Sequence, residues 1–451
     1  MTATPKTPDE LRTAVREAMP SVRADLEALV KIPSVSADPA RKDDVQRSAE
    51  ATAELFRGEG FDDVRILSAG GGAPAVVARR PAPDGAPTVL LYAHHDVQPV
   101  GDPADWDSPP FEPTERGDRL YGRGAADDKA GIAAHLAAIR AHGDALPVGV
   151  TVLVEGEEEV GSPTLAAFLG EHKDLLAADV IVIADSGNWD IGEPALTTSL
   201  RGLIDCFIEV RTLDHGVHSG MWGGVVPDAM TAMVRLLASL HDDAGDVAVA
   251  GFHSGPAADV DYPTDRMRRE AGLLDGVEEI GTGSIVERVW TKPAIATIGL
   301  DVTRTADASN TLIPAVKAKI SVRLAPGDSS ASAMDALEKH LEAHVPWGAH
   351  LTFTEGERGE PTQIDATGPA YDAARAAFRD AWDGVEPVDQ GVGGSIPFIA
   401  AFNAAFPDAA VLVTGVEDPD TRAHGANEGL HLAEFERVCV AEALLLHNLA
   451  I

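Results

Sequence analysis

The feature that most constrains this chain is a repeated layout, in which an apolar, β-rich run of residues stops abruptly at His, Asp or Glu. Three runs end at His94, at Glu157–Glu159 and at Asp185, a fourth leads into a loop with His424, and a Gly-containing turn at 120–129 carries Asp127 and Asp128. In open α/β sheets, ligands gather beyond the carboxyl ends of the strands. Imidazoles and carboxylates that meet there, with no cysteine among them, suit zinc or a similar divalent ion. The layout therefore predicts a hydrolytic metal centre at one edge of a sheet.

The composition sets limits on size and partners. At 451 residues the chain exceeds what one hydrophobic core usually serves, so two domains are expected. It has 72 acidic and 36 basic residues, a net charge of -36. Nucleic acids and anionic membrane surfaces both attract clustered Lys and Arg. Neither is therefore expected as a partner.

Cysteine usage and the chain ends bear on location. Cys206 and Cys439 are the only cysteines, and each lies in an apolar run, which excludes a disulfide framework and predicts buried free thiols. The first residues lack the apolar stretch of a signal peptide. No apolar run reaches the roughly 20 residues of a membrane-spanning helix. A cytoplasmic location is expected.

Hydrophobic periodicity predicts a catalytic domain interrupted by a smaller one. Helical patterns cover 9–31, 43–58 and 129–142, and strands alternate with helices from 64 to 185, as in a mostly parallel sheet. After residue 201 the order is strand 202–211, helix 227–241, strands 294–302 and 316–324, helix 331–345 and strand 350–355, the ferredoxin-like β-α-β-β-α-β arrangement. A helix at 371–382 and a strand at 409–413 follow. We predict a doubly wound, mostly parallel α/β domain (1–199 and 363–451) around a ferredoxin-like α/β domain (200–362).

Two motifs have chemical interpretations beside simpler ones. In His94-His95-Asp96, Asp96 could hydrogen-bond the second nitrogen of a metal-bound His94, but a loop histidine beside an unrelated aspartate gives the same pattern. Glu157–Glu159 could supply one carboxylate to a metal and another to take a proton from attacking water. A solvated acidic turn is the alternative.

The remaining candidates are also ambiguous one by one. Asp127 and Asp128 precede a helix, where capping and the helix dipole favour carboxylates without any further role, and Asp185 has a similar alternative. His424 lies in a polar, Gly-containing segment that does not suit a core histidine. Five such signals at successive element ends are hard to produce by chance, so together they favour a site.

Three segments then identify a resemblance. Tyr92–Pro99, Trp106–Phe111 and Leu120–Lys129 resemble the M20 metallopeptidases, most closely their cytosolic non-specific dipeptidase and carnosinase branch. Glu158–Ser162, Gly393–Pro397 and Ala423–Glu428 match further family motifs in the right order, so the resemblance spans roughly residues 10 to 450. Ala93, His95 and Ala130 depart from the usual pattern without removing a ligand. His95 offers a rival imidazole, although only one of two successive strand residues can point into the site.

The resemblance implies two divalent ions per chain, usually zinc with manganese as the alternative. Asp127 would bridge them, His94 and Asp185 would complete one shell, and Glu159 and His424 the other. Asp96 would orient His94, Glu158 would be the general base, and the Asp127–Asp128 peptide bond would be cis.

For the inserted domain, the resemblance implies a lid that also forms a homodimer. His218 would reach the partner's active site, Asn310 and Arg323 would contact substrate, with Arg323 taking its terminal carboxylate, and Gly394 and Ser395 would belong to a substrate-binding loop. The expected reaction is hydrolysis of small peptides with a free C-terminal carboxylate. An N-acyl amino acid deacylase or carboxypeptidase of the same family is the alternative, and a non-catalytic binding protein on this fold is a remote one.

Overall fold

The structure is a computed structural model that describes residues 5–256, 258–394 and 397–450. It divides into two compact units. Unit 1 comprises the described residues up to 198, 364–390 and those from 397 onward, and unit 2 comprises 199–363 and 391–394. The sequence analysis had assigned the short segment 391–394 to the catalytic domain, whereas its contacts place it in unit 2.

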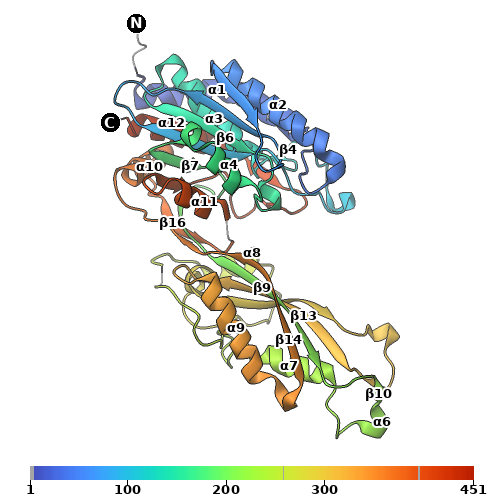
Figure 1. Ribbon diagram of the computed structural model, residues 1–451. Helices are drawn as coiled ribbons and strands as arrows, with labels where there is room; N and C mark the ends of the chain where they lie inside the picture. Colours follow the sequence, from blue (N-terminus) through green and yellow to red (C-terminus); the bar gives the residue numbers. More distant parts are fainter. Residues whose placement is uncertain (1–4, 257, 395–396, 451) are drawn as a thin grey trace. The chain divides into compact units, whose positions relative to one another are not determined.

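The nine-stranded sheet lies mainly in unit 1 and is mixed rather than mostly parallel (Figure 1). Its strand order is β1 (Asp63–Leu67), β2 (Ala75–Arg80), β6 (Gly149–Glu155), β3 (Thr88–His94), β7 (Val180–Ile183), β17 (Ala410–Val413), β8 (Ala195–Leu200) and β15 (Thr362–Gln363), with β16 (Val388–Val392) also on β8. The four central strands, β6, β3, β7 and β17, are parallel. The strands flanking them are antiparallel. The predicted parallel sheet therefore forms only the centre.

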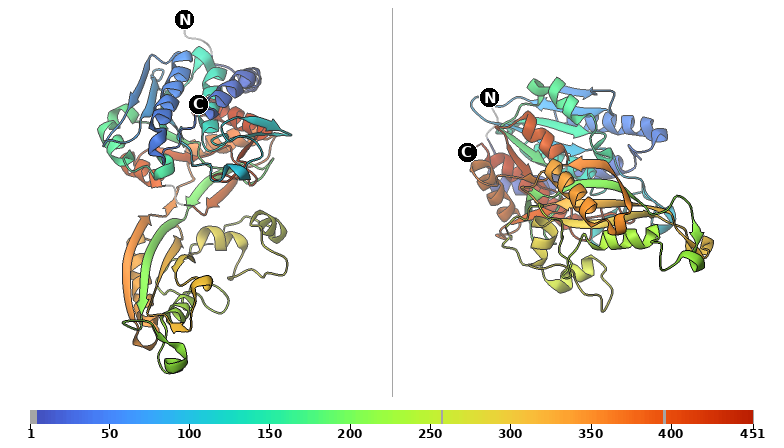
Figure 2. Two further views of the ribbon diagram at one scale, coloured as in Figure 1. Left: turned by 90° about the vertical axis from the view of Figure 1, so that its right-hand side faces the viewer. Right: turned by 60° about the horizontal axis from the view of Figure 1, so that its bottom comes forward.

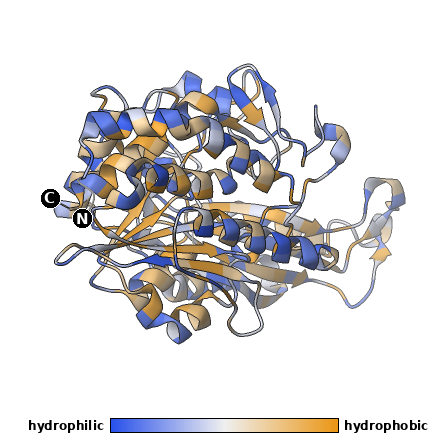
Figure 3. Ribbon diagram, turned by 90° about the horizontal axis from the view of Figure 1, so that it is seen from above, coloured by the Kyte–Doolittle hydropathy of each residue, from blue (hydrophilic) through white to orange (hydrophobic). Residues whose placement is uncertain are grey.

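Continuous apolar runs explain why the central strands lie inside. Every residue of β6 and β7, and all but the first of β3, is buried, as expected for parallel strands covered on both faces. Figure 3 shows these strands coloured mainly hydrophobic. The helices of unit 1 are α1 (Pro8–Val30), α2 (Lys42–Gly58), α3 (Lys129–His142), α4 (Leu165–Glu171), α5 (Lys173–Leu176), α10 (Pro369–Ala381), α11 (Pro397–Ala405) and α12 (Leu432–Asn448). A capping box between Thr7 and Glu10 begins α1.

Unit 2 contains the predicted β-α-β-β-α-β order. Its elements are β9 (Gly202–Arg211), α7 (Ala229–Ala238), β11 (Ala294–Asp301), β13 (Ala315–Leu324), α9 (Ser330–His344) and β14 (His350–Gly359). The strands form an antiparallel sheet in the order β11-β13-β9-β14 (Figure 2). Even-numbered residues of β9 and β13 pack against α7 and α9 in one core. Odd-numbered residues, including Arg323, therefore lie on the face away from that core.

Several short elements could not be predicted, because two to four residues show no periodicity. They are β10 (Val217–His218) paired with β12 (Thr311–Leu312), α6 (Ser219–Trp222), and the sheet of β4 (Thr114–Arg116), β5 (Arg119–Tyr121) and β18 (Gly429–His431). A further helix, α8 (Thr264–Glu270), lies in the polar segment after α7. Within the described residues, every helix is too short or too polar to span a bilayer.

Candidate metal centre

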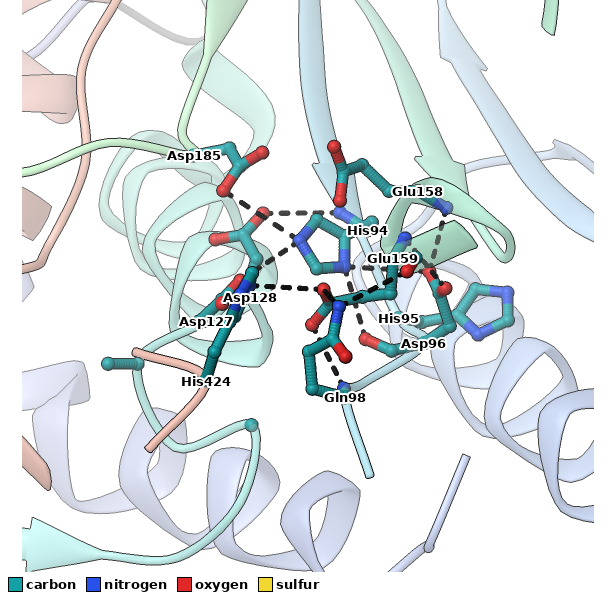
Figure 4. Close-up of polar contacts among 12 residues, drawn as sticks. His94, His95, Asp96, Gln98, Asp127, Asp128, Glu158, Glu159, Asp185 and His424 are labelled. Atoms are coloured by element: carbon teal, nitrogen blue, oxygen red, sulfur yellow. Dashed lines mark hydrogen bonds and ion pairs between the residues drawn. The ribbon is translucent and has the colours of Figure 1, made fainter. Parts of the chain in front are cut away.

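Three parallel strands deliver the candidate ligands to one edge of the sheet. β3 ends at His94, β7 ends two residues before Asp185, and β6 ends three residues before Glu158. Because these strands run in the same direction, the side chains after them meet (Figure 4). This is the arrangement that the sequence predicted.

Asp127 lies between the two imidazoles. One of its carboxylate oxygens is 3.1 Å from Nε2 of His94, and the other is 3.1 Å from Nε2 of His424. His424 Nε2 is also 3.2 Å from Glu159, and His94 Nε2 is 3.7 Å from Asp185. Each oxygen of Asp127 thus faces a different histidine and a different second carboxylate. The Asp127–Asp128 peptide bond is cis.

Asp96 fixes both the histidine and the glutamates. It is fully buried, and Nδ1 of His94 lies 3.1 Å from its main-chain carbonyl oxygen and 3.5 Å from its carboxylate. The same carboxylate accepts hydrogen bonds from the main-chain N–H groups of Glu158 and Glu159. One residue therefore sets the orientation of His94 and the register of the glutamate turn.

The three consecutive glutamates have separate surroundings. Glu157 turns away and accepts hydrogen bonds from the main-chain N–H groups of Ala73 and Thr164. Glu159 accepts two from Gln98, one from its main chain and one from its side-chain amide. Figure 4 shows the Glu158 side chain directed toward the His94 and Asp185 side of the cluster. Only the second and third glutamates therefore belong to it.

The pKa values show that the cluster carries excess negative charge. Burial raises the pKa of Glu158 to about 9, and burial with the neighbouring Asp185 raises that of Asp128 well above its ordinary value. Hydrogen bonds to Asp127 and Glu159 raise the pKa of His424 to about 10. Burial opposes protonation of His94, but its carboxylate neighbours outweigh burial and raise its pKa as well. A bound cation would favour the charged forms of these carboxylates and the neutral forms of the imidazoles.

The donor set therefore fits divalent cations. Ligand atoms of His94, Asp127 and Glu159 lie within 4.8 Å of one another, and so do those of His94, Asp128 and Asp185. Nitrogen and oxygen donors without sulfur suit zinc or manganese. Asp128 was not among the predicted ligands, although its position beside Asp127 in the sequence could have suggested it. Its carboxylate also accepts a hydrogen bond from the main-chain N–H of His94.

The rival imidazole of His95 is outside the cluster. It is fully buried on the other side of the strand, where Nε2 lies 2.8 Å from the carbonyl oxygen of Pro74. Burial lowers its pKa to about 4, which keeps it neutral. Strand alternation thus separates the two neighbouring histidines, as expected.

The predicted lid residues lie in unit 2 and form two groups. His218 and Asn310 are exposed neighbours, since β10 pairs with β12 and the N–H of Ser219 donates to the carbonyl oxygen of Asn310. Arg323 lies near the far end of β13, opposite Leu203. Gly394 is half-buried in the segment that also belongs to unit 2, and Ser395 lies outside the described residues.

A buried residue that the sequence analysis did not assign holds the Asp127 turn. Glu428 has no exposed surface and accepts four hydrogen bonds, from Nη1 of Arg123 and from the main-chain N–H groups of Gly124, Ala126 and Asp127. Arg123 also donates to the carbonyl oxygen of Gly425. Glu428 therefore ties the loop of His424 to the turn of Asp127.

Glu428→Gln is expected to weaken metal binding by about 10- to 100-fold, the usual range for groups that orient ligands. The new amide group would place a donor against existing donors. The matched control is Glu434→Gln, because Glu434 is also buried and accepts instead from Nε1 of Trp382, the residue just after α10. Competition with a chromophoric chelator measures both affinities. Equal affinities in the two variants would contradict this role.

Comparison with known proteins gives a consistent family. A family model described as Peptidase family M20/M25/M40 matches residues 90–448. The chain is 35% identical over 428 residues to the cysteinylglycine-S-conjugate dipeptidase of Corynebacterium striatum, covering 94% of each. It is 30% identical over 370 residues to the Beta-Ala-His dipeptidase of Rattus norvegicus, covering 76% of this chain and 73% of that one. The crystal structure of human carnosine dipeptidase 1 matches 99% of this chain and 100% of its own, with 25% identity and a TM-score of 0.80.

Proposed function

This chain belongs to peptidase family M20/M25/M40, and we propose that it is a dinuclear metal-dependent dipeptidase acting on substrates with a free C-terminal carboxylate. The proposal rests on the position of Asp127, whose two carboxylate oxygens face two different imidazoles. The dipeptidase names of its relatives supply the substrate class.

We propose that one ion would be held by His94, Asp185 and the carboxylate oxygen of Asp127 that faces His94. The second is assigned to Glu159, His424 and the other oxygen of Asp127. Zinc is the preferred metal and manganese the alternative, because both accept nitrogen and oxygen ligands. Bound divalent ions would supply Lewis-acid polarisation and make water more acidic at neutral pH.

Glu158 is the proposed general base. Its main-chain N–H is fixed by Asp96, and its side chain reaches the His94 and Asp185 side of the cluster (Figure 4). Its carboxylate would take the proton of the attacking water and return it to the leaving amine. The Asp96 carboxylate accepts hydrogen bonds from the main-chain N–H groups of both Glu158 and Glu159. It thereby fixes the proposed general base and the proposed metal ligand at adjacent positions of one turn.

The lid residues are proposed to serve two active sites. From Ala315 to Arg323, β13 advances eight steps of about 3.3 Å, or roughly 26 Å, so the His218 group and Arg323 are too far apart to hold one dipeptide from the same chain. We therefore propose a homodimer in which His218 and Asn310 complete the partner's site. Arg323, Gly394 and Ser395 would contact substrate in the chain's own site, with Arg323 on the terminal carboxylate.

A subunit-mixing experiment tests this arrangement. Inactive Glu158→Gln chains mixed with inactive His218→Ala chains should regain partial activity, because one site of each hybrid dimer has both groups. The control mixture, Glu158→Gln with Asp127→Ala, should stay inactive, since each chain brings a defect in unit 1. If subunit exchange is demonstrated and no activity returns, the proposal of an active site shared between two chains is wrong.

Substrate class is tested by a hydrolysis screen. S-substituted Cys-Gly, β-Ala-His and other dipeptides should be cleaved faster than tripeptides and N-acyl amino acids, with zinc or manganese and not after chelation. Faster cleavage of N-acyl amino acids would favour the deacylase alternative, and release of single residues from longer peptides would favour a carboxypeptidase. No hydrolysis of any of them would favour the non-catalytic alternative. The cytoplasmic location and the lack of nucleic-acid and membrane partners stay predictions from the sequence.

A further inference from the structure

Unit 2 holds a guanidinium that has no carboxylate partner among the described residues. Arg201 directly precedes β9, and its only side-chain hydrogen bond among the described residues is a long one, 3.4 Å from Nη1 to the carbonyl oxygen of Arg288. Its Nε is buried and has no hydrogen-bond partner in the part of the chain that the structure describes. Elsewhere in unit 2, arginines such as Arg358 are paired with carboxylates. A half-buried cation whose Nε is shielded from water and unpaired is costly, so a group that completes it is expected.

A second cation lies close to Arg201. Arg323 is paired in the sheet with Leu203, two residues after Arg201. Burial and the charge of Arg323 lower the pKa of Arg201 to about 10, because the two positive charges repel each other. Within residues 5–256, 258–394 and 397–450, neither forms an ion pair with a carboxylate. Two adjacent cations without a counter-charge are unusual in a chain of net charge -36.

The segment 391–394 lies against this pair. The main-chain N–H of Arg201 donates to the carbonyl oxygen of Val392. A Cβ on Gly393 would lie 3.0 Å from an Nη atom of Arg201, so the missing side chain at this position leaves room for the guanidinium. The same segment continues into Gly394, which the family resemblance assigns to substrate binding.

From these contacts we infer that Arg201 is a second substrate-binding arginine, which forms with Arg323 an anion site for the terminal carboxylate of the substrate. The inference rests on the proposed function and adds a specificity-determining residue to it. Two guanidinium groups offer enough N–H donors to satisfy both carboxylate oxygens, and their mutual repulsion is relieved only when the anion is present. A neutral amide at the same place would leave both cations uncompensated.

The test compares a dipeptide with the corresponding dipeptide amide. Arg201→Gln should lower kcat/KM for the free acid by about 10- to 100-fold, the range of a charge-assisted hydrogen bond, and leave the slower hydrolysis of the amide unchanged. Arg323→Gln should show the same pattern. The matched control is Arg358→Gln, on β14 opposite Ile204, whose guanidinium already pairs with Glu355; it should change neither rate.

Two further measurements keep the outcomes distinct. Arg201→Lys retains a cation without the planar fork and should lose less than Arg201→Gln, again only for the free acid. If Arg201→Gln slows the acid and the amide equally, the residue is merely structural and the inference is overturned. If the wild-type protein cleaves no dipeptide, the proposed function fails separately. Calorimetric binding of the dipeptide to Glu158→Gln and to the Glu158→Gln/Arg201→Gln double variant then tests the anion site without turnover, and equal affinities would overturn it.

Discussion

Glu158→Gln is expected to retain its metal ions and to lower kcat by about 10²- to 10⁴-fold, because an amide cannot accept the proton of the attacking water. Glu159→Gln should weaken metal binding instead, since its carboxylate faces His424. Steady-state kinetics and metal analysis of the purified variants separate the two effects.

The neighbouring Glu157→Gln is the matched control for that prediction. Glu157 accepts hydrogen bonds from Ala73 and Thr164 and takes no part in the cluster. We expect its loss to affect stability more than either catalysis or metal content. If Glu157→Gln loses activity with its metals retained, while Glu158→Gln loses metal, the assignment of the glutamates is wrong by one residue.

Asp127→Ala is expected to lose both metal ions, because this carboxylate faces both halves of the cluster. His424→Ala should mainly affect one ion, since its Nε2 faces Glu159 and a single oxygen of Asp127. Metal content after equilibrium dialysis, measured beside circular dichroism to confirm folding, gives the comparison. An Asp127→Ala protein that binds as much metal as the His424→Ala protein would argue against a bridge.

Much of this cluster could be predicted because its residues follow consecutive parallel strands. A buried strand appears in the sequence as a continuous apolar run, and its end marks where a polar side chain can emerge. His94 and Asp185 follow that rule directly. Strand alternation also predicted that His94 and His95 would separate.

Other parts could not be predicted, because their partners are remote in sequence. Glu428 holds the turn of Asp127 from about 300 positions away, and no local pattern links the two.

The antiparallel strands at the edges of the main sheet could not be predicted either. Buried antiparallel strands show the same apolar runs as parallel ones, so periodicity does not distinguish their direction.

Each chain is proposed to hold two divalent ions that share Asp127. The most direct measurement strips the wild-type protein with a chelator, reloads it with excess zinc, removes free metal, and determines zinc per chain by mass spectrometry against the protein concentration from amino-acid analysis. We expect two ions per chain. A single ion per chain, at any excess of zinc, would contradict it.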